Sequence, residues 1–164
     1  DINIYNLNLI IGLFGAPNNL IYQARKGFNG IDTSGVVLMS YPEFQALAIG
    51  AKDSDSPSTC LIQGEKGWLK VETAPNQLEK IACQIRGEDN IQEYALNQYP
   101  HRLSHEFAAF AAMLANKDFA GRDLYLNISL QVAEAAEKSR KQADISFLAD
   151  QYLRSVPVGA KCPE

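Results

Sequence analysis

The first eight residues carry a carboxylate, a phenol and a carboxamide at helical spacing inside an otherwise apolar stretch. At about 100° per residue, Asp1, Tyr5 and Asn8 fall on one stripe of a helix, and Gly12 continues that stripe. Such side chains can bind a polar ligand or hold a proton at a fixed place. Burying them without a partner is costly, so the stripe is either a binding or catalytic site or a narrow side of the helix that faces water.

The two histidines, His101 and His105, stand four residues apart. On one helix face this spacing suits metal binding, but no third ligand is evident and His101 follows Pro100 in an expected loop. We therefore predict no metal site. The pair is expected either to line a substrate pocket or to serve as helix-capping and surface residues.

The sequence contains no motif that would hold a nucleotide phosphate. The glycine pairs Gly27/Gly30 and Gly64/Gly67 lie in expected turns between strands, whereas a dinucleotide loop joins a strand to a helix. A nucleophile elbow and a His-Glu-x-x-His motif are also absent. We expect this chain to bind no cofactor by itself.

The composition is that of a globular protein with an acidic balance. Of the 164 residues, 46% are hydrophobic and 21% are charged, with a net charge of -4. That charge argues against nucleic acid as a partner, and no apolar run reaches the ~20 residues of a membrane span. Three widely spaced cysteines, Cys60, Cys83 and Cys162, suit a reducing compartment, so a cytoplasmic location is expected.

Hydrophobic periodicity changes twice along the chain. It predicts a helix over residues 3–15, stopped by Gly15-Ala16-Pro17, and then a run of strands separated by turn residues. From Ser104 the spacing becomes helical, breaks between Asn116 and Gly121, and resumes with Asp123 as a cap. The expected strands are Leu20–Lys26, Ser34–Tyr41, Phe44–Lys52, Ser58–Gln63, Gly67–Thr73, Lys80–Ile85 and Ile91–Leu96.

This order predicts an α+β fold, with a large antiparallel-rich mixed β-sheet and helices packed on one of its faces. The other face would stay open. Apolar residues such as Val36, Leu38 and Trp68 suggest that a second copy covers it. We therefore expect a homodimer or homotetramer formed through the open face.

The opening helix resembles the helix that begins the C-terminal domain of the Gfo/Idh/MocA family (glucose–fructose oxidoreductase, inositol dehydrogenase, rhizopine catabolism). Members have an Asp, a His or Tyr four residues later, often another Asp three further on, and a Leu-rich turn ending in Gly-x-Pro. Here those positions hold Asp1, Tyr5, Asn8 and Gly15-Ala16-Pro17. Later segments resemble the same domain in the same order, over about residues 1–147: Asp32–Tyr41, Ile62–Trp68, His105–Phe110 and Ser129–Ser139.

The resemblance implies that the complete protein is larger. Members of the family carry an N-terminal Rossmann domain that binds NAD or NADP and contains a lysine in a Glu-Lys-Pro motif, and these 164 residues contain neither feature. Residues 1–147 would form the substrate-binding and oligomerisation domain, and residues 148–164 a C-terminal tail. The implied partners are the Rossmann domain and a small-molecule substrate.

The family resemblance also implies roles for single residues. Asp1 and Tyr5 would be catalytic and face the nicotinamide and the reacting carbon, while Asn8, His101 and His105 would bind substrate. A phenol beside a lysine can act as acid and base, because the cation lowers its pKa. Tyr5 stands where many members have His, so either Tyr5 or the absent lysine is the acid/base; Asn8 stands where many have Asp.

The sequence therefore indicates the substrate-binding half of an NAD(P)-dependent oxidoreductase. It would act by hydride transfer on a sugar, a cyclitol or a related secondary alcohol, and it would be inactive as an isolated chain. Two alternatives stay open. One is a non-catalytic module that dimerises or binds a ligand; the other is an enzyme of the same shape with another substrate class, such as a biliverdin or imine reductase.

Overall fold

The computed structural model describes residues 3–95 and 97–150. Helix α1 (Ile4–Phe14) comes first, a run of strands follows, and helices α2 (Ser104–Asn116) and α3 (Phe119–Gln142) come last. This order confirms the predicted α+β fold. The strands are β1 (Asn19–Lys26), β2 (Asp32–Ser40), β3 (Gln45–Ala51), β4 (Cys60–Gly64), β5 (Gly67–Val71), β6 (Ile81–Ile85) and β7 (Gln92–Tyr94), with a 3-10 turn η1 (Pro75–Gln77) before β6.

The described strands form two sheets, and within each sheet the strands that follow one another in the chain pair antiparallel. The first sheet has the order β1-β2-β3 and the second the order β4-β5-β6-β7. The antiparallel character was predicted, but the expected single mixed sheet is divided between β3 and β4. The connection there contains Asp53-Ser54-Asp55-Ser56-Pro57. Short polar residues and a proline favour a loop over a continuing ladder, which accounts for the division.

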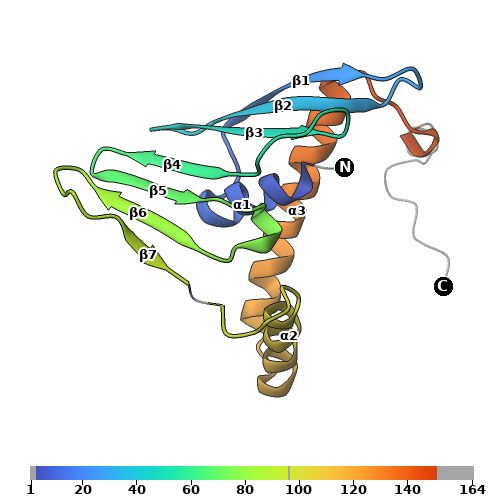
Figure 1. Ribbon diagram of the computed structural model, residues 1–164. Helices are drawn as coiled ribbons and strands as arrows, with labels where there is room; N and C mark the ends of the chain where they lie inside the picture. Colours follow the sequence, from blue (N-terminus) through green and yellow to red (C-terminus); the bar gives the residue numbers. More distant parts are fainter. Residues whose placement is uncertain (1–2, 96, 151–164) are drawn as a thin grey trace.

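The core lies between the β1–β3 sheet and helices α1 and α3, which Figure 1 shows on the same side of that sheet. The antiparallel register places Leu20 opposite Met39, and Tyr22 opposite Val37, with Ala48 next to Val37 on β3. These side chains face the helices, while the alternate residues face outward. The buried members of the cluster are Leu7, Ile11, Leu20, Val37, Met39, Ala48, Val132 and Ala135.

The end of α3 closes the free edge of β1. Gln142 accepts a hydrogen bond from the Tyr22 N–H at 2.8 Å and donates from its Nε2 to the Leu20 carbonyl at 3.0 Å. An edge strand exposes unpaired backbone groups. The Gln142 side-chain amide makes hydrogen bonds to β1 of the kind that a further strand would make. The contact fixes α3 against the sheet that carries the core.

The α2–α3 boundary differs in one respect from the sequence prediction. Lys117 adopts a left-handed conformation with φ 51° and ends α2, and the carboxylate of Asp118 accepts the Gly121 N–H at 2.9 Å. Asp118 is therefore the N-cap of α3, and the prediction of Asp123 was wrong. A glycine at position 121 suggests a helix break, but the hydrogen bond from its N–H to the Asp118 cap places Gly121 in the first turn of α3.

A clasp of ionic and aromatic contacts fixes the segment after α3. Arg140 donates two hydrogen bonds to Asp150, at 2.6 and 2.8 Å, and one to the Ile145 carbonyl at 2.7 Å. Its guanidinium also lies 4.7 Å from the ring centre of Phe147. The Arg140 hydrogen bonds lower the pKa of Asp150 from 3.8 to about 2. The contacts with Arg140 thus stabilise the charged form of the Asp150 carboxylate.

This clasp is expected to open in acid. Because the pKa of Asp150 is lowered on folding, its contribution is present above about pH 4 and is lost as pH falls towards 2. The amide of Phe147, which donates to Asp150 at 2.8 Å, reports the change by NMR. We expect its chemical shift to titrate in that window and the Asp150→Asn variant to show no such titration; an identical titration in the variant would contradict this prediction.

Two further features of the described residues are the hydropathy of the helices and the state of the cysteines. Among the described residues, no helix is both long enough and apolar enough to cross a membrane. Cys60 and Cys83 are free and partly buried, and burial raises the pKa of the Cys60 thiol. Cys162 and the residues from 151 onward lie outside the described part of the chain.

Candidate functional site

Helix α1 turns its polar stripe away from the core. Leu7 and Ile11 are buried against the sheet, whereas Tyr5 is 50% exposed and Asn8 and Gly12 are exposed. The Asn8 amide donates to the Ile4 carbonyl at 2.9 Å, back onto its own helix. No hydrogen bond within residues 3–95 and 97–150 engages the Tyr5 hydroxyl. Asp1, the other predicted catalytic residue, lies outside the described residues.

Two asparagines that the site prediction did not include attach the first turn of α1 to β3. The amide of Asn3 donates to the Ala48 carbonyl at 3.1 Å. Asn6 donates to the Ile49 carbonyl at 2.9 Å and to Asn3 Oδ1 at 2.7 Å. The sequence could have indicated the role of Asn3. Asn3 precedes Leu7 and Ile11 at the same four-residue spacing, so it lies on the buried stripe of the helix. These bonds fix the turn that carries Tyr5.

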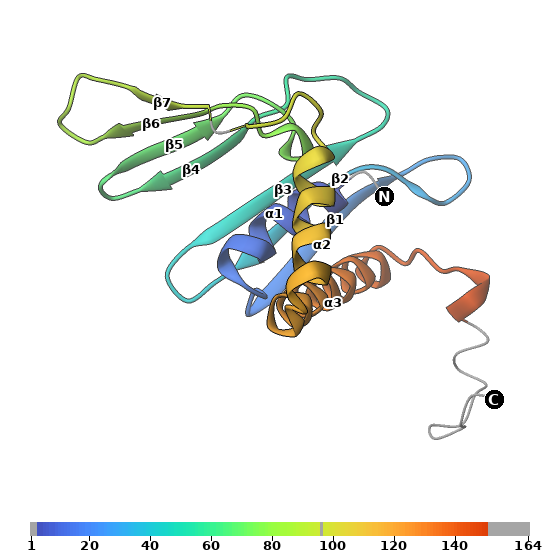
Figure 2. The same cartoon turned by 90° about the horizontal axis from the view of Figure 1, so that it is seen from below.

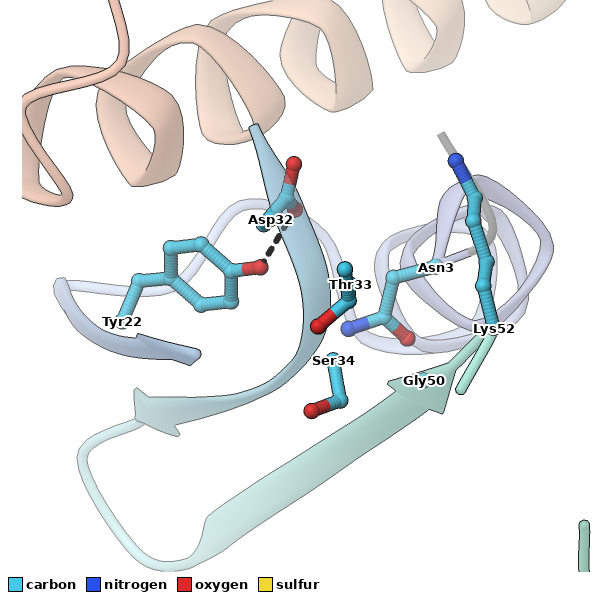
Figure 3. Close-up of a pocket in the computed structure, with 7 residues that line it drawn as sticks. All are labelled: Asn3, Tyr22, Asp32, Thr33, Ser34, Gly50 and Lys52. Atoms are coloured by element: carbon cyan, nitrogen blue, oxygen red, sulfur yellow. Dashed lines mark hydrogen bonds between the residues drawn. The ribbon is translucent and has the colours of Figure 1, made fainter. Parts of the chain in front are cut away.

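A small polar pocket lies where this turn meets the ends of β2 and β3 (Figure 3). Its free space suits roughly one water molecule. In Figure 3, Asn3 and Lys52 lie on the α1 side and Tyr22 on the far side, with residues of β2 between them. The lining residues are Asn3, Tyr22, Asp32, Thr33, Ser34, Gly50 and Lys52.

One short hydrogen bond in the pocket joins Tyr22 to Asp32. The phenol donates to the carboxylate at 2.6 Å, and both burial and this carboxylate raise the pKa of Tyr22. The phenol therefore remains protonated as a fixed donor. Its ring lies against Gly35, where any Cβ would overlap it. The pair holds β1 against the start of β2.

Of the two predicted histidines, His101 precedes α2 and His105 lies in its first turn. His101 is exposed, and its Nδ1 accepts the Leu103 N–H at 3.3 Å, as expected of a residue at a helix start. His105 packs edge-on against Tyr99, with ring centres 4.8 Å apart, and its buried Nε2 has no partner among the described residues. Among the described residues, no hydrogen bond, ion pair or ring contact joins either histidine to Tyr5 or Asn8. Residues 3–95 and 97–150 hold no cluster of three metal-ligating side chains.

Comparison with known proteins identifies relatives over almost the whole chain, although no family model matches it. It is 27% identical over 151 residues to scyllo-inositol 2-dehydrogenase (NADP(+)) IolU of Bacillus subtilis, covering 92% of this chain and 45% of that protein. It is 30% identical over 152 residues to the uncharacterized oxidoreductase YgjR of Escherichia coli, covering 92% of this chain and 44% of that protein. The chain thus spans a little under half the length of these relatives.

Solved structures share the fold. The aldose-aldose oxidoreductase of Caulobacter crescentus matches with a TM-score of 0.66 at 20% identity, over 87% of this chain and 44% of that one. UDP-N-acetylglucosamine 3-dehydrogenase GnnA of Acidithiobacillus ferrooxidans matches with a TM-score of 0.64 at 17% identity, over 87% and 46%. The chain is a relative of the C-terminal domain of Gfo/Idh/MocA oxidoreductases. The predicted family resemblance is therefore confirmed.

The described part of this Gfo/Idh/MocA-type domain does not fit a nicotinamide dinucleotide. Its strands are joined as antiparallel neighbours, so it offers no parallel strand–turn–helix unit whose glycines could approach a pyrophosphate. The small pocket beside Asn3 has room for a water molecule rather than a nucleotide. The domain presents a helix whose first turn is hydrogen-bonded to β3 and whose Tyr5 side chain is half exposed.

Proposed function

We propose that this chain is the substrate-binding half of an NAD(P)-dependent oxidoreductase that oxidises a secondary alcohol of a sugar or cyclitol. The match along 92% of the chain to a scyllo-inositol dehydrogenase carries the proposal. The exposed Tyr5 on a firmly attached α1 supports it, because a proton-transfer group must be accessible and fixed. The protein is proposed to work in the cytoplasm.

The proposed chemistry divides between two parts of the complete protein. Oxidation of a secondary alcohol removes a hydride from carbon and a proton from oxygen, and NAD or NADP bound by an upstream domain accepts the hydride. In this chain the phenolate form of Tyr5 takes the proton and becomes the phenol, either directly or as the partner of an upstream lysine. Asp1 and Asn8 on the same stripe position the hydroxyl, and His101 and His105 line a more distant part of the substrate site.

An assay of the full-length protein tests this proposal. Purified protein is supplied with NAD or NADP and with a panel that includes scyllo-inositol, myo-inositol and common aldoses, and reduced cofactor is followed by absorbance. Turnover of at least one polyol is expected, while the isolated 164-residue chain should give none. Full-length protein that binds the cofactor but oxidises no member of a broad alcohol panel would count against the proposal.

The outer face of the β1–β3 sheet favours self-association as a second property. Ile21 of β1 and Leu47 of β3 lie in register on either side of Leu38 of β2. Ile21 is 51% exposed, Leu47 is 61% exposed, and Ile49, two residues further along β3, is 65% exposed. An apolar sheet face of this kind in a globular domain indicates an interface. We propose that two copies meet through it, as the sequence prediction of a dimer or tetramer expects.

A charge on this face should prevent the association. The Leu47→Glu variant is expected to run as a monomer in light scattering at a concentration where the unmodified protein is a dimer or tetramer, because the partner cannot solvate a buried carboxylate. Leu13→Glu, at an exposed position of α1, is the matched control and should leave the mass unchanged. A Leu47→Glu variant that keeps the full oligomeric mass would exclude this face as the interface.

A further inference from the structure

The first turn of α1 has an attachment to the sheet in place of an ordinary helix cap. Asn3 occupies the N-cap position, where an asparagine side chain ordinarily accepts a hydrogen bond from a backbone N–H of the first turn. The Asn3 side chain makes no such bond. Its Nδ2 donates instead to the Ala48 carbonyl of β3 at 3.1 Å. A local contribution to the stability of α1 is therefore absent at the turn that carries Tyr5.

Asn6 extends this attachment from the third position of the helix. An N-cap oxygen commonly accepts the backbone N–H of that position, whereas Asn3 Oδ1 accepts the side-chain Nδ2 of Asn6 at 2.7 Å. The same Nδ2 donates to the Ile49 carbonyl at 2.9 Å. Asn3 and Asn6, here named the amide bridge, thus join one helical turn to two consecutive carbonyls of β3.

Tyr5 lies on the other side of the same turn. At about 100° per residue it is about 160° around the helix from Asn3, and its side chain is 50% exposed. Figure 1 and Figure 2 both show α1 beside the β1–β3 sheet, so the phenol faces away from the strand that the amide bridge binds. Directional bonds to two successive residues oppose rotation of the turn about the helix axis, which non-directional apolar packing opposes less.

The length of the tyrosine side chain makes this rotation important. With a Cα radius of about 2.3 Å, the hydroxyl lies roughly 8 Å from the helix axis, so a rotation of about 10° moves the oxygen by on the order of 1 Å. A misplacement of about 1 Å can lower the rate of a reaction by about 10²-fold. An acid–base group on a helix therefore needs the rotation of that helix to be fixed as well as its distance from the core.

We propose that Asn3 and Asn6 are positioning residues for proton transfer by Tyr5, an inference that rests on the proposed function. The amide bridge fixes the rotation of α1, and the burial of Leu7 and Ile11 fixes its distance from the sheet. If packing were the only requirement, Asn3 would contribute more to stability as an ordinary cap. Local stability is commonly given up where function requires a particular geometry, and the absent cap lies at the turn that carries the phenol.

The Asn6→Asp variant of the full-length protein tests this role, because it keeps the shape of the side chain and removes both N–H donors. A carboxylate in the first turn also interacts favourably with the helix dipole, so the amide bridge is lost while the helix itself is supported. We expect kcat for alcohol oxidation to fall by about tenfold or more, with a much smaller change in KM. Asn6→Leu, which removes the donors without adding a charge, should show the same pattern.

Gln142→Leu is the matched control. It also removes a side-chain amide that joins a helix to a strand of the β1–β3 sheet, through the Leu20 carbonyl at 3.0 Å, but that helix is α3. The free energy of unfolding should fall as in Asn6→Leu, whereas kcat should stay within about twofold of the unmodified value. Equal losses of kcat in Gln142→Leu and in the two Asn6 variants would give the amide bridge a merely structural role and overturn the inference.

A spectroscopic measurement tests the amide bridge without turnover. 3-Fluorotyrosine is placed at position 5 of the full-length protein, and its fluorine NMR signal is compared among the variants. Asn6→Asp and Asn6→Leu should change the chemical shift and linewidth of this signal, and Gln142→Leu should leave both unchanged. An unchanged signal in both Asn6 variants, or an unchanged kcat in a protein that oxidises alcohols, would overturn the inference. If the full-length protein oxidises no alcohol, only the proposed function fails, and the fluorine signal decides whether the amide bridge orients Tyr5.

Discussion

Replacing Tyr5 with phenylalanine in the full-length protein is expected to lower kcat for alcohol oxidation by about 10²–10⁴-fold, the range for loss of a general acid–base group. The side chain is half exposed on the first turn of α1, and no described group engages its hydroxyl. Removing that oxygen should therefore leave the fold intact. Because the ring stays in place, KM should change far less than kcat.

The control for this prediction is Tyr94→Phe, which makes the same chemical change on β7, where the hydroxyl donates to Gln92 Oε1 at 2.6 Å. That variant should keep the unmodified kcat. Tyr5→His offers a second comparison, because many members of the family have histidine at this position. It should retain activity within about tenfold of the unmodified protein, with the pH profile moved towards lower pH since imidazole titrates near 6.5. A Tyr5→Phe variant with more than half of the original kcat would assign proton transfer to the upstream lysine instead.

The order of helices and strands could be predicted because it depends on local signals. Apolar runs bounded by turn residues define β2 and β3. The stop of α1 at Gly15 follows from a φ of 77° that glycine adopts without strain. The C-terminal helices follow from four-residue spacing. Each of these signals lies within a few residues of the feature that it determines.

The division into two sheets could not be predicted in the same way. Whether β4 continues the ladder of β3 depends on non-local pairing, and a polar connection such as Asp53–Pro57 is equally compatible with a wide hairpin within one sheet. Periodicity identifies the face of a strand, but it does not identify the neighbour on its edge.

The pocket beside α1 was missed for a related reason. Tyr22 and Asp32 lie ten positions apart on neighbouring strands, and they meet because the ring extends over Gly35 along the strand. A glycine inside a predicted strand is the available signal for such a close approach. By contrast, the stripe of Tyr5 and Asn8 was found because it lies on one helix. That it faces outward could be established only once Leu7 and Ile11 were seen to be buried.

The attachment of α1 leads to the second large prediction, which concerns stability. Ile11 is 1% exposed and packs among Leu20, Val37 and Met39. Ile11→Ala is expected to lower the free energy of unfolding by about 2–5 kcal/mol, because it removes buried methyl groups and leaves a cavity that a rigid sheet cannot fill. Urea unfolding followed by the fluorescence of Trp68 measures this change through the shift of the midpoint at constant slope.

Leu13→Ala is the matched control, because it truncates a large aliphatic side chain two residues away on the same helix, where the side chain is 58% exposed. Its effect should stay within about 0.5 kcal/mol. Equal losses in the two variants would mean that α1 is stabilised by its own helical structure rather than by the sheet. A large loss confined to Ile11→Ala would show that the core under the β1–β3 sheet stabilises α1. Burial at position 11 would then determine how firmly the phenol at position 5 is positioned, although the two side chains lie on opposite sides of the helix.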